Sequence, residues 1–299
     1  MTAGSPARAG RVRRAGRRPG WVAALVIVLP VAASGCGPLR LPTRLPAGAS
    51  MTTSVVHLPG GLLELHLAAP AVRRPGVPLV LYASGDGGWF GAAVGMFRSV
   101  AADGYPAVGF STRAFLRLAI DRRAHVRGQV ARAYATIVAQ ARQRLGLPGE
   151  TPVVLTGWSR GASLAAIAAG PLIGSERVQG VVAIGLDDGD DLAVDDQASD
   201  DDDRPEPGKG GGGSFDTFML LRALAPTRSS VIQSTRDEYL PASAARVLFG
   251  PDTDVRRFFA VEARNHRFSG AAAPLETALR DALAWVSDGP VPPPCKPGA

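Results

Sequence analysis

The sequence predicts an α/β fold in which a mostly parallel central sheet is flanked by helices and preceded by an N-terminal β-hairpin. Short apolar segments typical of buried strands alternate along the chain with longer segments typical of helices. Such alternation favours a parallel sheet covered on both faces. The chain has 299 residues, of which 46% are hydrophobic and 20% charged, and can bury one sizeable core. We therefore expect one α/β domain with terminal extensions.

The expected elements follow one another without internal repeats. Alternation of apolar and polar residues around a Pro-Gly-Gly turn predicts a hairpin, with strands at 53–58 and 62–67. Continuous apolar segments predict buried strands, and segments rich in Ala, Leu and Arg predict helices. The further strands are expected at 77–83, 107–110, 153–156, 178–186, 229–234 and 256–261. The helices are expected at 90–102, 121–145, directly after residue 161, at 242–248 and at 273–286.

The basic N-terminus explains most of the net charge of +7. Six arginines precede the first apolar segment, so the rest of the chain is nearly neutral; they are Arg8, Arg11, Arg13, Arg14, Arg17 and Arg18. A nucleic-acid-binding domain carries its basic residues on a folded surface. We therefore expect no nucleic-acid partner.

Residues 1–36 have the pattern of a bacterial export signal. The apolar segment 21–33 is interrupted by Pro30 and is shorter than the roughly 20 residues that span a bilayer. Ala33-Ser-Gly-Cys36 resembles a lipobox, in which the cysteine becomes the lipidated first residue of the mature protein. We expect an exported cell-envelope lipoprotein, held on the outer side of the cytoplasmic membrane or in the periplasm. The alternative is a cleaved signal without lipidation, which would allow a Cys36–Cys295 disulfide.

The flanks of the domain differ from it in composition. Residues 37–50 are rich in Pro, Gly and Ala, which predicts a flexible tether. The domain itself is expected over residues 51–288, and residues 289–299 form a Pro-rich tail.

The segment Gly157-Trp-Ser-Arg-Gly161 carries the clearest chemical signal. It lies between a buried-type strand and a segment of small residues typical of a helix. The Gly-X-Ser-X-Gly pattern in a strand–turn–helix context is the nucleophile elbow of α/β-hydrolases, which exposes a serine above the end of the sheet. The sequence therefore predicts Ser159 as a catalytic nucleophile in an α/β-hydrolase fold.

A glycine-rich turn at 84–89 follows the strand expected at 77–83. Hydrolases of this fold take one oxyanion-hole N–H from the corresponding turn and one from the residue after the nucleophile. We expect the backbone N–H groups of Asp86 and Arg160 to form this hole. A carboxylate there would oppose the developing negative charge, so the Asp86 side chain must point away or serve a cationic group.

The remaining triad members follow from their order along the chain. In this architecture the order is serine, acid, histidine. His266 is the only histidine after Ser159, and it lies in a loop expected to follow a strand. Asp237, in the turn after another strand, is the expected acid, and Glu238 is the adjacent alternative. His266 would take the proton of Ser159, and Asp237 would hold the imidazole tautomer.

The combination of these motifs resembles the bacterial AcvB/VirJ family of exported α/β-hydrolases. The resemblance covers about residues 77–286 and depends on Ser-Gly-Asp-Gly-Gly-Trp at 84–89 and on the elbow. It implies hydrolysis of lysyl-phosphatidylglycerol and, for some members, a role in virulence-related secretion. Trp158 and Arg160 stand where the family has Tyr and Phe. The candidate substrate-binding residues are Asp86, Trp89 and Trp158.

An acidic segment interrupts the domain after the strand expected at 178–186. Ten aspartates lie within residues 187–203, and a glycine-rich stretch continues to residue 214. This composition predicts a disordered insert on the rim of the active site. A calcium site is the alternative, although the spacing of an EF-hand is absent.

The sequence therefore predicts an exported serine hydrolase that needs no metal or cofactor and cleaves an ester through Ser159, Asp237 and His266. The expected substrate is an aminoacylated phospholipid, most plausibly the lysyl ester, with Asp86 pairing with its ammonium group. Asp86 could instead cap the helix expected near Phe90 or order its own loop. The alternatives in function are a generic carboxylesterase or acyl-peptide hydrolase, and a catalytically silent secretion accessory protein tethered to the membrane by its lipid anchor.

Overall fold

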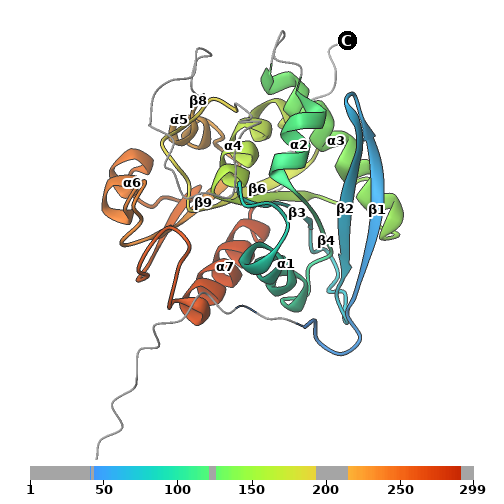
Figure 1. Ribbon diagram of the computed structural model, residues 1–299, viewed down its shortest axis with the longest axis horizontal. Coiled ribbons are helices and arrows are strands. Elements are labelled where there is room, and N and C mark those ends of the chain that lie inside the picture. The colour runs from blue at the N-terminus through green and yellow to red at the C-terminus, as the bar shows by residue number, and fades with distance from the viewer. Residues whose placement is uncertain (1–40, 42–43, 121–125, 193–214, 291–299) are drawn as a thin grey trace, which may run out of the picture. The chain divides into compact units, whose positions relative to one another are not determined.

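A computed structural model shows an eight-stranded sheet that is flanked by helices, as the sequence predicts (Figure 1). The structure describes residues 41, 44–120, 126–192 and 215–290. Cys36, Cys295, the predicted export signal, His125 and most of the acidic insert lie outside these residues. Within the described ranges, none of the helices has the length and apolar character that crossing a membrane requires.

The strands of the main sheet occur at nearly the expected places. They are β1 (Ser50–Leu58), β2 (Gly61–Ala69), β3 (Leu79–Ala83), β4 (Ala107–Phe110), β5 (Val153–Trp158), β6 (Val178–Ile184), β9 (Arg228–Ser234) and β10 (Arg256–Val261). The helices are α1 (Gly91–Ala102), α2 (Thr112–Ala119), α3 (Val126–Arg144), α4 (Arg160–Ile173), α5 (Thr217–Arg222), α6 (Ala242–Phe249) and α7 (Ala272–Ser287). The short helices α2 and α5 were not expected. The side chain of Ser111 caps α2 by accepting a hydrogen bond from the N–H of Ala114.

The order of strands brings several loops to one edge of the sheet. The order is β1-β2-β4-β3-β5-β6-β9-β10, with β1–β2 and β2–β4 antiparallel and the remaining pairs parallel. The carboxyl ends of β3, β5, β6, β9 and β10 therefore meet at the same edge. Ligand sites of open α/β sheets form at this edge.

Two apolar layers hold the sheet between its helices. Helices α1 and α7 lie together on one face, and α3 and α4 lie together on the other (Figure 1). Alternate strand residues point to opposite faces: Leu81 and Leu155 join the layer under α3 and α4, whereas Val80 and Val154 join the layer under α1 and α7. Burial on both faces explains why the central strands are apolar throughout.

The start of the acidic insert is ordered, and this corrects the expectation of disorder from residue 187. The two-residue strand β7 (Gly189–Asp190) pairs with β8 (Phe215–Asp216) in a small antiparallel ladder. Residues 193–214 lie outside the described residues. The expected tether also differs in part, because Leu41 is buried beside α1.

The close approach of β5, α4 and the end of β3 requires glycine at two positions. A Cβ atom on Gly157 would overlap the carbonyl group of Gly161, and one on Gly161 would overlap the carbonyl oxygens of Ala83 and Ser84. These neighbours are backbone atoms and cannot turn aside. The elbow therefore depends on both glycines for packing.

We predict that Gly161→Ala lowers the free energy of unfolding by about 3 kcal/mol, because the added methyl group forces apart backbone that is already in contact. Gly149→Ala is the matched control, since a Cβ there meets nothing within 4 Å. Urea denaturation of both variants measures the difference. Equal stability of Gly161→Ala and the control would contradict the close approach.

Candidate active site

Ser159 lies in the turn between β5 and α4 in a backbone conformation that few residues other than glycine adopt. Its φ is 55° and its ψ is −124°. Such strain persists only where the surrounding structure enforces it. Here the Ser159 N–H donates to the carbonyl oxygen of Ile184 on the adjacent strand β6, at 2.8 Å. The predicted elbow thus has the strand–turn–helix geometry and the strained serine backbone of a nucleophile elbow.

His266, in the loop after β10, pairs with Asp237, the expected acid. Its Nδ1 lies 2.8 Å from Oδ2 of Asp237, whose side chain is fully buried. Glu238, the alternative acid, accepts a hydrogen bond from the backbone N–H of His266 at 2.7 Å. The structure thus brings Asp237 to the imidazole and Glu238 to the backbone. Nε2 of His266 is buried and has no hydrogen-bond partner within the described chain.

Gly185, the residue that follows β6, lies against the imidazole, and we call this contact surface the β6 shelf. A Cβ on Gly185, whose φ is 59°, would lie 3.1 Å from Cε1 of His266 and 3.4 Å from Cδ1 of Trp158. The indole of Trp158 lies nearly parallel to the imidazole, with ring centres 6.4 Å apart, and the ring of Tyr239 meets it edge-on at 4.9 Å. Trp158 and Tyr239 therefore flank the imidazole, and Ser159 follows Trp158 directly.

The glycine-rich turn after β3 lies against the nucleophile. A Cβ on Gly85 would be 3.4 Å from both Cβ of Ser159 and the carbonyl oxygen of Trp158. The turn is held from α2, because the N–H of Thr112 donates to Oγ of Ser84 at 3.2 Å. This placement brings Asp86, which follows Gly85, close to Ser159 and Arg160. Asp86 and Arg160 are the residues expected to supply the oxyanion hole.

The side chains of these two residues also meet. Nη1 of Arg160 lies 3.4 Å from Oδ1 of Asp86, Nε lies 3.4 Å from Asp190, and Nη2 lies 3.7 Å from Asp191. Asp86 is 64% exposed, whereas Asp190 is only 8% exposed. Arg160 is thus a cation that faces Asp86, and it joins the elbow to the start of the acidic segment. Helix α1 begins after Phe90 without a side-chain cap, so the expectation that Asp86 caps it is wrong.

Two aspartates near the elbow are partly desolvated. Burial raises the pKa of Asp190, and the charge of Arg160 opposes this rise. Burial also raises the pKa of Asp187, which lies just beyond the β6 shelf and within the electrostatic influence of His266. Within the described chain, no three His, Cys, Asp or Glu side chains are grouped as a bound metal ion would require.

Trp89 differs from its expected role. Its indole stacks on His66 with ring centres 4.2 Å apart and meets Tyr82 and Phe97 edge-on. It fills the space above Gly109 of β4, where a Cβ would overlap the ring. These are contacts with the core around β2, β4 and α1. They give Trp89 a packing role and do not support its assignment to substrate binding.

Gln233 lies on strand β9, which is buried from Ser229 to Ser234, and it was not recognised in the sequence. Its Nε2 donates to Oδ2 of Asp237 at 3.1 Å. Its position in a predicted strand, four residues before the acid, is the only signal that the sequence offers for it, because its complete burial is seen only in the structure.

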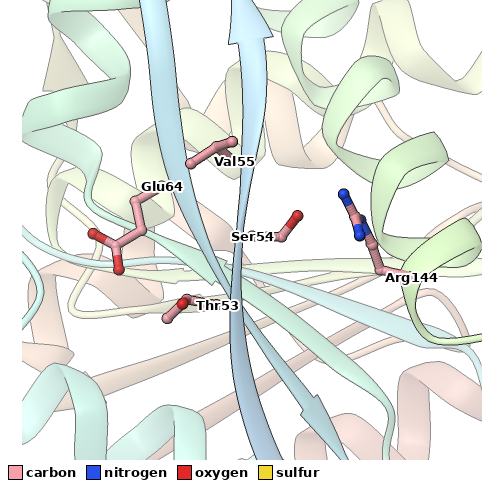
Figure 2. A pocket seen from close by; sticks show the side chains of 5 residues that line it. All are labelled: Thr53, Ser54, Val55, Glu64 and Arg144. Carbon is pink, nitrogen blue, oxygen red and sulfur yellow. The ribbon is translucent and has the colours of Figure 1, made fainter.

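A surface hollow on the hairpin is separate from this site. It is lined by Thr53, Ser54, Val55, Glu64 and Arg144. Figure 2 shows the Arg144 side chain directed toward β1 from α3, with Glu64 on the other side of the strand. The hollow contains none of the residues discussed above.

Comparison with solved structures places the fold. The chain is similar to an esterase domain from Rhodothermus marinus (TM-score 0.54, 16% identity, 80% of this chain and 99% of that chain). It is similar to an arylesterase (0.53, 17%, 83% and 87%) and to a thermostable carboxylesterase cloned from a metagenomic library (0.52, 19%, 84% and 92%). No family model and no curated protein matches the sequence. The chain therefore has the α/β-hydrolase fold, which confirms the predicted fold class.

We predict that Arg160→Met lowers the free energy of unfolding by roughly 3 kcal/mol near pH 7, because it leaves the buried Asp190 without this ion pair. Loss of Arg160 would raise the pKa of Asp190 further in the folded state. The loss of stability relative to the parent protein should therefore be small below the ordinary aspartate pKa of about 4. It should grow as the pH rises from the folded-state pKa of Asp190 in the parent protein to the higher folded-state pKa of Asp190 in the variant.

The measurement is chemical denaturation of Arg160→Met and of the parent protein across this pH range. Asp86→Asn is the control, because it removes an ion pair at an exposed carboxylate and should cost less than about 1 kcal/mol. A loss for Arg160→Met that is the same at all pH values would contradict the assigned role of Asp190.

Proposed function

We propose that the protein is an exported serine hydrolase that cleaves a carboxylic ester through Ser159, His266 and Asp237. The observation that carries this proposal is the buried His266–Asp237 pair, at 2.8 Å, whose imidazole lies near Trp158, the residue before the strained Ser159. A packing role alone would not explain an imidazole nitrogen that is buried and has no hydrogen-bond partner in the part of the chain that the structure describes. The fold neighbours named as esterases support the same class of reaction.

The geometry supports a two-step reaction. Nε2 of His266 takes the proton of the Ser159 hydroxyl as its oxygen attacks the ester carbon, while Asp237 keeps the other ring nitrogen protonated and stabilises the imidazolium. The backbone N–H groups of Asp86 and Arg160 donate hydrogen bonds to the oxyanion. His266 then gives its proton to the leaving alcohol. Water, activated by the same imidazole, releases the acid from the acyl-enzyme and restores the serine.

The proposed substrate is an aminoacyl ester, most plausibly the lysyl ester of phosphatidylglycerol. The resemblance of residues 84–89 and of the elbow to the AcvB/VirJ family suggests it. Carboxylates around the site are consistent with a cationic acyl group, because Asp86 and Asp188 are exposed and Asp187 is partly exposed. A generic carboxylesterase or acyl-peptide hydrolase, and a silent accessory protein, are the alternatives.

Export and anchoring belong to the same proposal. They depend on the sequence pattern of residues 1–36, with Cys36 as the lipidated residue. A thioether-linked diacylglycerol together with an N-terminal acyl chain would hold the domain stably at a membrane. An enzyme attached in this way would meet a phospholipid substrate at the surface of the membrane.

We predict that Ser159→Ala, His266→Ala and Asp237→Asn each lower kcat/KM for an activated ester by roughly a thousandfold or more, because the three groups act as one unit. Glu238→Gln is the control, since it changes the neighbouring acid, which accepts a hydrogen bond from the His266 backbone N–H. Steady-state kinetics of folded variants tests the assignment. Activity of Ser159→Ala within tenfold of the parent protein, or greater loss in Glu238→Gln than in Asp237→Asn, would refute it.

We also predict that Asp86→Asn lowers kcat/KM about tenfold more for a lysyl ester than for a neutral ester of similar size, because it removes an exposed negative charge next to Ser159. The difference should shrink at high salt. Asp252→Asn is the matched control, since Asp252 is an exposed aspartate paired with Arg246 outside the site. An equal decrease for both esters would assign Asp86 to the structure of the turn.

A further inference from the structure

Gln233 is a fully buried amide whose hydrogen-bonding groups are used on both sides. Its Oε1 accepts from the N–H of Leu186 at 3.0 Å. Its Nε2 donates to Oδ2 of Asp237 at 3.1 Å and to the carbonyl oxygen of Leu240 at 2.7 Å. The side chain is 0% exposed, so water does not compete for these positions.

These partners allow only one orientation of the amide. A backbone N–H can only donate, and a carbonyl oxygen can only accept. Oε1 must therefore face Leu186, and Nε2 must face Leu240 and Asp237. The N–H that points at the acid is thus fixed by two neutral backbone groups and does not depend on Asp237 itself.

The arrangement determines which direction the Asp237 carboxylate faces. A buried carboxylate is costly unless donors surround it. Oδ1 accepts from the N–H groups of Tyr239 at 3.0 Å and Leu240 at 3.4 Å, and Oδ2 is shared by Gln233 and Nδ1 of His266. Among the described residues, Gln233 is the one side chain besides His266 that forms a hydrogen bond with this carboxylate.

The same amide connects the acid to the surface on which the imidazole lies. Leu186 follows Gly185, and the space above Gly185 holds the His266 ring. Asp237 and Leu240 belong to the turn after β9. Gln233 therefore links the shelf under the imidazole to the turn that presents the acid, and it sets the spacing between them.

We propose that Gln233 is a positioning residue for the triad: it holds the Asp237 carboxylate in line with Nδ1 of His266 and makes no contact with the substrate. The proposal rests on the function proposed above and adds a residue to its machinery. A residue of this kind acts on turnover through the acid, and it has no direct effect on substrate binding.

The first test compares two buried glutamines. Gln233→Met keeps the size of the side chain and removes the amide, and we expect kcat to fall at least about tenfold with KM changed less than about twofold. Gln179→Met is the matched control, because Gln179 is a buried β6 residue that donates to the carbonyl oxygens of Ser287 and Gly289. It should lose stability and keep kcat. A similar kcat for both variants would overturn the proposal.

A double-mutant cycle then tests whether Gln233 acts through the acid. In an Asp237→Asn background the carboxylate is already absent, so Gln233→Met should lower the residual kcat by less than about twofold. The same fold-reduction in both backgrounds would mean that Gln233 acts independently of Asp237, which would overturn the proposal.

A third readout does not require activity. A proton held between Nδ1 of His266 and Asp237 should give a low-field proton NMR signal, assigned by its loss in His266→Gln. We expect the signal to be lost or broadened in Gln233→Met and retained in Gln179→Met. If the protein hydrolyses no ester and the signal still behaves in this way, the proposed function fails and the positioning role stands. Retention of the signal in folded Gln233→Met overturns the positioning role.

Discussion

The structure of the site depends on the close approach of β5, α4 and the end of β3. Gly157 and Gly161 leave no room for side chains at this crossing, and Ser159 between them takes a φ of 55°. The crossing also brings the turn at Gly85 against the nucleophile. Because the turn, the nucleophile and the next backbone N–H are fixed by one packing constraint, the serine and its expected oxyanion donors are positioned together. His266 and Asp237, the other members of the proposed triad, are supplied by the loops after β10 and β9.

Two buried carboxylates near this crossing, those of Asp237 and Asp190, are held in different ways. Asp237 is satisfied mainly by hydrogen bonds from its own turn and from Gln233, which leaves one direction open to the imidazole. Asp190 is instead paired with Arg160, while the Leu192 N–H also donates to it. The first arrangement orients the proposed triad acid toward His266. The second fixes the start of the acidic segment, as far as Leu192, to the elbow. A buried charge needs such partners in either case.

The fold class and the three residues of the proposed triad could be predicted because their signals lie within single segments or in the order of segments along the chain. Ser159 is marked by a strand–turn–helix pattern, and chain order selects Asp237 and His266. Contacts between distant segments could not be predicted. Trp89 packs into space left by Gly109 of β4, and Arg160 meets aspartates from two other loops. The ordered start of the acidic segment requires pairing with residues 215–216 across the insert, which composition does not reveal. In sequence, Gln233 looks like any polar residue in a strand.

The most direct test of the account is to map the site of covalent modification by a fluorophosphonate, which reacts with an activated serine. We predict one phosphonyl group per chain on the tryptic peptide that contains Ser159, because among the serines that the structure describes Ser159 alone has a positive φ, and the ring of Trp158 before it lies near the His266–Asp237 pair. A folded protein that forms no adduct, or one modified at another serine, would contradict the account.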